Sequence, residues 1–181
     1  LEVSNNSFWQ GHVTAPDLLS EVVKDFAGVK SADHVLDLYG GVGLFAAALI
    51  ETVGPEGRID LIEGSKSATS DASRNFAENS NVKVITGDVA THLPRINSAD
   101  VVVLDPPRDG AGKIVVSEIS RLKPRRIVYV ACDPAALARD TGYFLERGYS
   151  LVKLRAFDLF PMTHHIECVA LYERAEVSSA L

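Results

Sequence analysis

Two residues with reactive side chains each follow a short apolar run that is typical of a buried strand. Cys132 follows Arg126–Ala131 and precedes a helical pattern, so a helix N-terminus would favour its thiolate. Asp105 opens the segment Asp105–Arg108 (DPPR), whose two prolines stiffen a loop that can hold the carboxylate toward a planar substrate. A lone cysteine is more often a small core residue, and an acid after a strand often only ends it. Neither residue decides a function alone.

A glycine-rich segment, Asp37–Gly43 (DLYGGVG), stands between the first predicted strand and a helix, where the chain must turn tightly and let a ligand approach. Glu63 ends the next predicted strand, twenty positions after Gly43, where an acid can accept hydrogen bonds from ribose hydroxyls. Asp88 follows the third strand and is placed to bond an adenine amino group, although it is also a common turn residue. These residues predict a nucleotide-like ligand. A nicotinamide cofactor and a plain strand-to-helix turn both stay open at this point.

The elements that position these residues follow from hydrophobic periodicity. Short β-branched runs alternate with helical patterns, which predicts βαβ units and a parallel sheet covered on both faces. We expect seven strands, at His34–Tyr39, Arg58–Glu63, Val82–Thr86, Asp100–Leu104, Arg126–Ala131, Ser150–Phe157 and Glu167–Tyr172. We expect helices at Thr14–Ala27, Leu44–Val53, Ser65–Asn79, Lys113–Leu122 and Ala135–Arg147.

The last two strands are joined by a segment too short for a crossover, so we expect them to be antiparallel. The predicted fold class is α/β: a class I (Rossmann-like) methyltransferase with a seven-stranded, mostly parallel sheet, a C-terminal antiparallel hairpin and helices on both faces.

Composition sets further bounds. The 181 residues, 46% of them hydrophobic, suit one domain, which we expect over 1–174 with a tail at 175–181. No apolar run is long enough to span a bilayer and no signal peptide is evident, so we expect a cytoplasmic protein without a membrane partner, and a monomer. Two cysteines exclude a disulfide framework. The net charge of -6 argues against a broad phosphate-gripping face.

Five separated motifs together resemble the RNA uracil-5 methyltransferases, over residues 7–173 and in the right order. The motifs are Phe8–Gln10, Asp37–Gly43, Asp105–Arg108, Cys132–Pro134 with Leu137–Asp140, and Phe157–Glu167. The resemblance implies S-adenosylmethionine as cofactor, tRNA or rRNA as substrate, Cys132 as nucleophile and Glu167 as base. It puts six residues at cofactor positions, Gln10, Tyr39, Leu44, Glu63, Asp88 and Asp105; from the glycine loop we add Asp37, Gly41 and Gly43.

The chain departs from the family pattern at several positions without losing a reacting group. Gly40 stands where relatives often carry Cys, and Leu44 where some carry Asn. Ala131 and Asp133 replace Ser and Asn. The family's N-terminal RNA-binding domain is expected to lie outside this fragment, and two cysteines cannot supply a four-cysteine iron–sulfur cluster.

The chemistry explains why these groups are needed. Carbon 5 of uracil is a weak nucleophile, so thiolate addition to carbon 6 would activate it. Asp105 would orient the ring and Glu167 would remove the carbon 5 proton. We expect the helix after Pro134, or a cation such as Arg108 or Arg139, to lower the pKa of Cys132. As substrate contacts we expect Arg108, Phe160 and His165. Phe160, Phe157 or His165 would stack on the base, although aromatic residues in such a run more often belong to the core.

Three alternatives stay open from the sequence. An amino-methyltransferase would use the DPPR loop and need no cysteine. A non-catalytic cofactor-binding module would bind the ligand without turnover. A zinc site is the third, built from Cys132, His164, His165 and Cys168. The spacing of these residues does not match standard zinc sites, so we expect no metal.

Overall fold

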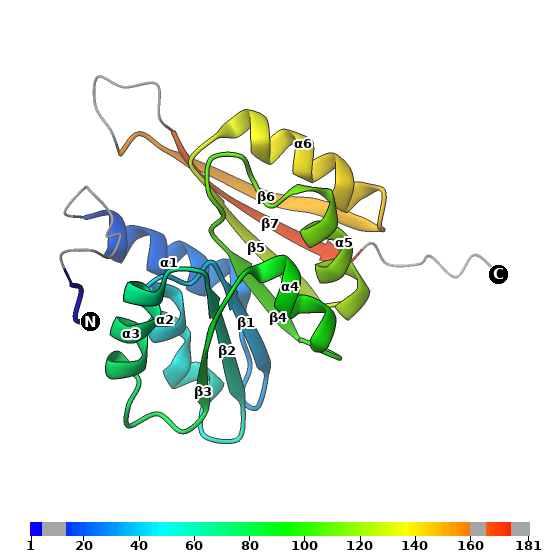
Figure 1. Ribbon diagram of the computed structural model, residues 1–181. Coiled ribbons are helices and arrows are strands. Elements are labelled where there is room, and N and C mark those ends of the chain that lie inside the picture. Colours follow the sequence, from blue (N-terminus) through cyan, green and yellow to red (C-terminus); the bar gives the residue numbers. More distant parts are fainter. Residues whose placement is uncertain (5–13, 160–165, 175–181) are drawn as a thin grey trace.

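The computed structural model describes residues 1–4, 14–159 and 166–174. Within them, strands and helices alternate along the chain (Figure 1). The strands are β1 (His34–Leu38), β2 (Arg58–Glu63), β3 (Val82–Thr86), β4 (Val101–Leu104), β5 (Arg126–Ala131), β6 (Tyr149–Phe157) and β7 (Glu167–Arg174). The helices are α1 (Ala15–Ala27), α2 (Leu44–Val53), α3 (Lys66–Asn75), α4 (Val89–His92), the 3-10 turn η1 (Leu93–Arg95), α5 (Gly112–Leu122) and α6 (Pro134–Leu145).

The described strands form one seven-stranded sheet in the order β3-β2-β1-β4-β5-β7-β6. Neighbours from β3 to β5 are parallel, whereas β7 is antiparallel to both β5 and β6. This confirms the predicted class I fold with its antiparallel hairpin. The strand order reverses between β1 and β4, and ligands of such sheets bind beyond the carboxyl ends of the strands at this point. The segments after β1 and β4 are the glycine loop and the DPPR loop.

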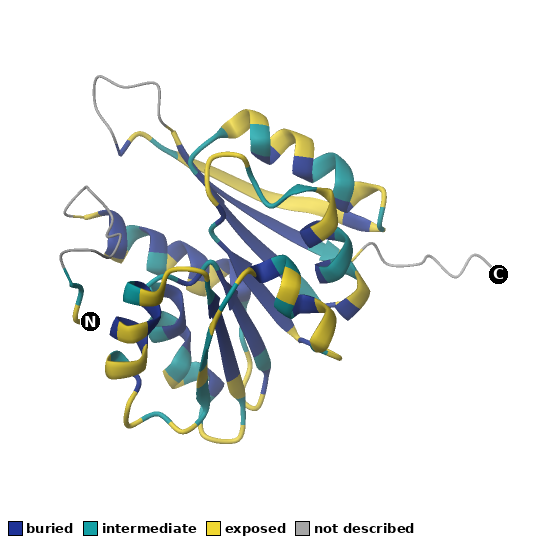
Figure 2. Ribbon diagram, viewed as in Figure 1, coloured by how far each residue is buried: buried dark blue, intermediate teal, exposed yellow. Residues whose placement is uncertain are grey.

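Both faces of the sheet are buried (Figure 2). Alternate residues of each strand enter one of two apolar clusters: Val35, Val103 and Val128 pack against α1 and α2, while Leu36, Val102 and Ile127 pack against α5. The central strands therefore read as continuous apolar runs, because neither side meets water. The edge strand β6 differs, since most of it is exposed.

Several predicted boundaries were wrong for local reasons. Helix α3 begins at Lys66, because Ser65 caps it by accepting a hydrogen bond from the Ala68 N–H, and it ends at Asn75 rather than Asn79. The short α4 and η1 were missed, since four and three residues are too few to show a helical period. Tyr39 is not part of β1, because its φ of 59° turns the chain out of the strand.

The remaining helices and strands match the expected ones to within two residues at each end. No helix in the described ranges combines the length and the apolar character that a membrane crossing requires.

Candidate active site

Two of the predicted site residues, Asp37 and Asp105, share one side of the sheet at its carboxyl edge. Asp37 lies two positions after Val35 on β1, in the alternation that faces α1 and α2. Asp105 follows Val103 in the same alternation, and its N–H donates to the Leu38 carbonyl at 3.2 Å, which holds it beside the end of β1. Successive side chains of a strand point to opposite faces. Both carboxylates are therefore directed to the same side.

The pairing of β5 with β7 brings Cys132 close to Glu167. Ala131 pairs with Cys168, so the next positions in this antiparallel register are Cys132 and Glu167. Opposed residues in such a pair have side chains about 4.5 to 5.5 Å apart at Cβ. Glu167 in turn pairs with Phe157 of β6, so three adjacent strands place these groups in one row.

Electrostatic coupling supports the same arrangement. Burial, followed by the charges of Glu167 and Asp37, raises the pKa of Asp105 well above its ordinary value. Burial also raises the pKa of Glu167, whose side chain is almost inaccessible. Strongly shifted carboxyl groups that gather at the ligand-binding edge of a sheet are typical of a catalytic site.

The expected lowering of the Cys132 pKa was wrong for this structure. Burial raises the pKa of the thiol, and the negative charges of Glu167 and Asp105 raise it further, while Arg108 opposes them with a smaller effect. The N-terminus of α6 is capped by Asp133, which accepts from the Ala136 N–H at 2.8 Å and so brings another carboxylate beside the cysteine. The thiol therefore lies in a surplus of negative charge.

The glycine loop is held by two acids. Asp37 is fully buried and its Oδ2 accepts from the Ala46 N–H in the first turn of α2 at 3.0 Å, while its Oδ1 has no hydrogen-bond partner among the described residues. Burial, against that hydrogen bond, raises the pKa of Asp37 to about 7. Glu63 accepts from the N–H groups of Gly41 at 3.1 Å and Ser65 at 2.6 Å, which ties the loop to the end of β2.

Three further predicted cofactor residues surround this loop. Tyr39 is partly buried, and burial together with the Asp88 charge raises its pKa to about 12, which puts the two side chains within electrostatic range. Asp88 caps α4 by accepting from the N–H and hydroxyl of Thr91, both at 2.9 Å. Leu44 begins α2 and packs partly against the α1 cluster.

The loop that carries Arg108 is fastened by a residue whose role the sequence did not reveal. Asp140 of α6 is fully buried, and its Oδ2 accepts from the N–H groups of Ala111 at 2.8 Å and Gly112 at 3.1 Å and from the Tyr129 hydroxyl at 2.8 Å. Arg139 donates to the other oxygen and to the Asp109 carbonyl. Arg139 therefore binds Asp140 and the Asp109 carbonyl, and it does not serve as the expected cation that lowers the pKa of Cys132.

A sequence signal for this residue did exist. Leu137, Asp140 and Phe144 are the buried positions of α6, at helical spacing, so an acid occupies the apolar face of a helix. Such a position requires donors around it.

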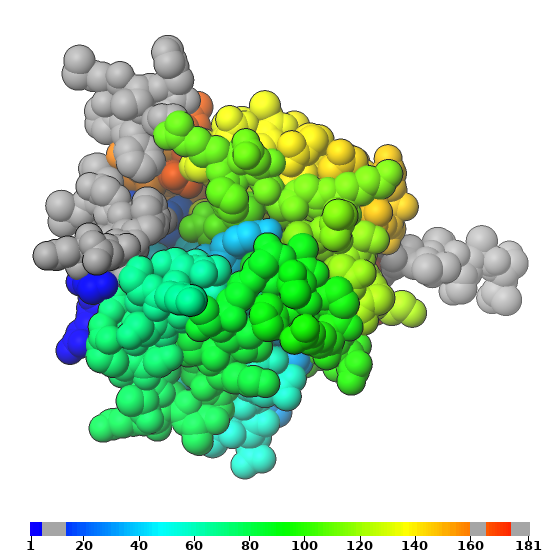
Figure 3. Space-filling view, in the orientation of Figure 1, coloured from blue at the N-terminus to red at the C-terminus, as the bar shows by residue number. Residues whose placement is uncertain are grey.

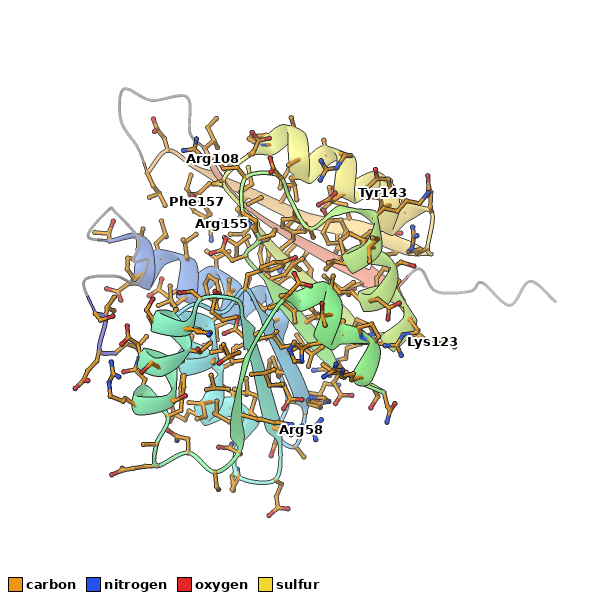
Figure 4. The ribbon with its side chains drawn as sticks, in the orientation of Figure 1. Arg58, Arg108, Lys123, Tyr143, Arg155 and Phe157 are labelled. Atoms are coloured by element: carbon orange, nitrogen blue, oxygen red, sulfur yellow. The ribbon has the colours of Figure 1, made fainter. Side chains whose placement is uncertain are left out.

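Three of the expected site residues, Gln10, Phe160 and His165, lie outside the described residues, as does His164 of the alternative zinc site. Within the described part of the chain, no group of three or more His, Cys, Asp and Glu side chains is arranged to hold a metal ion. Figure 4 shows Arg108 and Phe157 toward the same end of the molecule, with the Arg155 guanidinium 4.9 Å from the Phe157 ring centroid.

Comparison with known proteins adds to this geometry. The family model described as tRNA (Uracil-5-)-methyltransferase matches residues 1–175. The chain belongs to this family. The resemblance found in the five motifs is thereby confirmed, and a nicotinamide enzyme is excluded as the reading of the glycine loop.

Two relatives and one solved structure illustrate the likeness. An uncharacterized RNA methyltransferase of Streptomyces avermitilis is 51% identical over 175 residues, covering 96% of this chain and 40% of the relative. The 23S rRNA (uracil(1939)-C(5))-methyltransferase RlmD of Acinetobacter baylyi is 36% identical, covering 93% of this chain and 38% of that protein. The crystal structure of Pyrococcus abyssi tRNA (uracil-54, C5)-methyltransferase in complex with S-adenosyl-L-homocysteine superposes with a TM-score of 0.77 at 29% identity, covering 92% of this chain and 40% of the other. The chain spans about two fifths of the length of these relatives.

Proposed function

We propose that the protein transfers a methyl group from S-adenosylmethionine to carbon 5 of a uridine in tRNA or rRNA, with Cys132 as nucleophile and Glu167 as base. The observation that carries this proposal is the pairing of Ala131 with Cys168, which makes Cys132 and Glu167 the next positions along β5 and β7. The charge of Glu167, which raises the pKa of the Cys132 thiol, supports their proximity. An amino-methyltransferase needs no thiol beside a buried carboxylate. Membership of the uracil-5 methyltransferase family supports the same reaction.

The residues of the glycine loop fit S-adenosylmethionine. Asp37 has a buried carboxylate oxygen that no described residue donates to, and the ammonium group of the methionine part would supply a donor. Gly41 has a φ of 55°, and a Cβ at this position would meet no atom of the described residues within 4 Å, which leaves room for a ligand beside its backbone. Glu63, which ends β2, can accept from the ribose hydroxyls. When bound, the cofactor supplies an electrophilic methyl group.

The protein's own groups then carry the remaining chemistry. The Cys132 sulfur adds to carbon 6 of uracil, which moves electron density onto carbon 5 and oxygen 4 and makes carbon 5 the nucleophile toward the methyl group. Glu167 takes the proton from carbon 5 after methylation, and the returning electron pair breaks the bond between carbon 6 and the Cys132 sulfur. Because the pKa of Asp105 is raised, its protonated form can donate a hydrogen bond to a uracil carbonyl and hold the ring in place.

Cys132 must lose its proton in a surplus of negative charge. The raised pKa of Asp105 favours its neutral form and reduces the repulsion that a thiolate meets, whereas Glu167 has to be ionised to act as the base. Arg108 on the DPPR loop is the described cation whose charge lowers the Cys132 pKa. We propose that it assists ionisation and contacts the RNA backbone.

The test uses the protein at its natural length, as wild type and as Cys132→Ala, with methyl-labelled S-adenosylmethionine and unmodified cellular RNA. Nucleoside analysis should find the label in 5-methyluridine for the wild type and none for the variant. The matched control is Cys168→Ala, because Cys168 is a buried residue of β7 whose neighbour is Glu167. Its product should be unchanged. Label in a methylated amine would identify an amino-methyltransferase, and binding without any labelled RNA would identify a non-catalytic module.

A further inference from the structure

A polar hollow lies at the opposite end of the sheet from the proposed active site. It has a volume of about 610 Å³. Its lining comes from the first half of β2, from β3 and from the link between β3 and β4: Arg58, Asp60, Lys83, Ile85, His92, Arg95, Ile96, Asn97 and Ser98. Figure 4 shows Arg58 and Arg108 at opposite ends of the molecule.

The hollow exists because this part of the sheet has little cover. The link between β3 and β4 provides only α4, with four residues, and η1, with three, whereas α5 and α6 have eleven and twelve. In Figure 3, green segments from the middle of the chain, which include α4 and α5, form much of the face toward the viewer. The residues of β3 are exposed or half-buried, and Arg58 at the start of β2 is exposed. Polar residues can occupy these positions instead of apolar ones.

The side chains that line the hollow carry a net positive charge, whereas the whole chain carries a net negative charge. The protein has a net charge of -6, yet Arg58, Lys83 and Arg95 line this site with a single carboxylate, Asp60. Asp60 lies opposite Lys83 in the register of β2 and β3, and its Oδ2 is 3.3 Å from the Arg58 guanidinium. Lys83 and Arg95 are exposed and make no hydrogen bond or ion pair with a described residue. Two cations are thus available to a ligand.

The floor of the hollow gives an independent sign of a ligand. The Asp60 side chain is only 6% exposed, and its Oδ1 has no hydrogen-bond partner among the described residues. The other oxygen, Oδ2, is 3.1 Å from His34 Nε2. A buried carboxylate oxygen without a donor is unfavourable, so a group in the hollow should supply one. A ligand that carries both an anion and a hydroxyl group could bind the exposed cations through the anion and donate to the buried Asp60 oxygen through the hydroxyl group.

We propose that this hollow binds the ribose-phosphate backbone of the RNA substrate, with Lys83 and Arg95 on a phosphate and the Asp60 side facing a ribose hydroxyl. This assignment rests on the proposed function, since it supplies a second contact for the same RNA. The lining cations are exposed, as in contacts with a nucleic-acid backbone, whereas a site for a small free ligand would enclose it among apolar groups.

The test compares Lys83→Gln/Arg95→Gln with the matched control Lys24→Gln/Lys123→Gln, which removes the same charge from exposed lysines outside the hollow. Affinity for a labelled hairpin RNA with uridines in its loop is measured without S-adenosylmethionine, between about 50 and 200 mM salt. The hollow variant should bind about tenfold more weakly, with a salt slope reduced by roughly 1 to 2, and the control should match the wild type. Circular dichroism of each variant checks that it is folded.

Equal losses in both variants, or no loss in the hollow variant, would overturn the proposal. Calorimetry with uridine monophosphate is the second arm: binding to the wild type that Lys83→Gln/Arg95→Gln abolishes would assign the hollow to a free nucleotide instead. Formation of 5-methyluridine is followed separately. If no methyl transfer occurs while RNA affinity still depends on the hollow, the proposed function fails and the backbone site stands.

Discussion

Replacing Asp140 tests how the loop that presents Arg108 is held. Three neutral donors converge on its Oδ2, from Ala111, Gly112 and Tyr129. In Asp140→Ala these donors lose their acceptor in a buried site, at about 1 to 3 kcal/mol each before relaxation. Since the loop can admit water, we expect a total loss of about 3 to 5 kcal/mol in the free energy of unfolding, the range for breaking a buried charged network.

Asp140→Asn separates the hydrogen bonds from the charge. Its amide oxygen can still accept from the three neutral donors, while its NH₂ group replaces the oxygen that faces Arg139, a side chain 44% exposed. Because the Arg139 side chain is exposed, its donors can turn to water when they lose the Asp140 oxygen, and we expect a loss of about 1 to 2 kcal/mol. The control is Asp109→Ala, which alters an exposed side chain on the same loop and should stay within about 0.5 kcal/mol of wild type.

Urea unfolding at constant m-value measures all three variants. A loss below about 1 kcal/mol in Asp140→Ala would refute the reasoning, since it would mean that the converging donors are satisfied elsewhere. Equal losses in the alanine and asparagine variants would also refute it, because the acceptor that Asp140→Asn retains would then contribute nothing to the free energy of unfolding.

Three further predictions concern the proposed site. Glu167→Gln should lower the pKa of Cys132, seen as faster alkylation at neutral pH, and slow turnover by about 10² to 10⁴; a rise in that pKa would contradict the assigned coupling. Because burial raises the pKa of Asp37 from 3.8 to about 7, its contribution to stability is present at low pH and lost as pH rises through about 7. Asp37→Asn should flatten that decline in urea unfolding, and an unchanged slope would refute the shift. Gly43→Ala should lower the free energy of unfolding by at least about 2 kcal/mol, because Gly43 has a φ of 97° and a Cβ there would overlap the Phe76 ring. Gly41→Ala should lower it by about 1 kcal/mol, because Gly41 has a φ of 55° and a Cβ there would meet no described atom. Urea unfolding measures both losses and calorimetry measures cofactor affinity; equal losses of stability would contradict the packing.

Most of the architecture was predictable because local patterns and tertiary packing agree. Val101–Leu104 reads as a strand buried on both faces, and the structure places it at the centre of the sheet as β4. The short link before β7 allowed no crossover, so the antiparallel hairpin followed from chain length alone. The helices α4 and η1 did not follow, because so few residues show no period.

The sequence named candidate site residues but did not predict their electrostatics. The motifs pointed to Cys132, Asp105 and Glu167, yet the local context of Cys132 suggested a lowered pKa. The structure raises that pKa, because burial and the charge of Glu167, from a strand that follows 35 positions later in the sequence, outweigh the helix terminus. Sequence proximity does not show which charges lie across a sheet. The same limit hid the donors around Asp140, which come from the DPPR loop and from β5.

The most direct test of the central claim is to trap the covalent bond between Cys132 and uracil. In RNA whose uridines are replaced by 5-fluorouridine, carbon 5 carries no proton for Glu167 to remove, so the adduct cannot be released after methylation. With S-adenosylmethionine present, intact mass and peptide mapping should find one methylated RNA adduct on Cys132 in the wild type, and none in Cys132→Ala. An enzyme that methylates ordinary RNA at carbon 5 and yet forms no adduct on Cys132 would contradict the account.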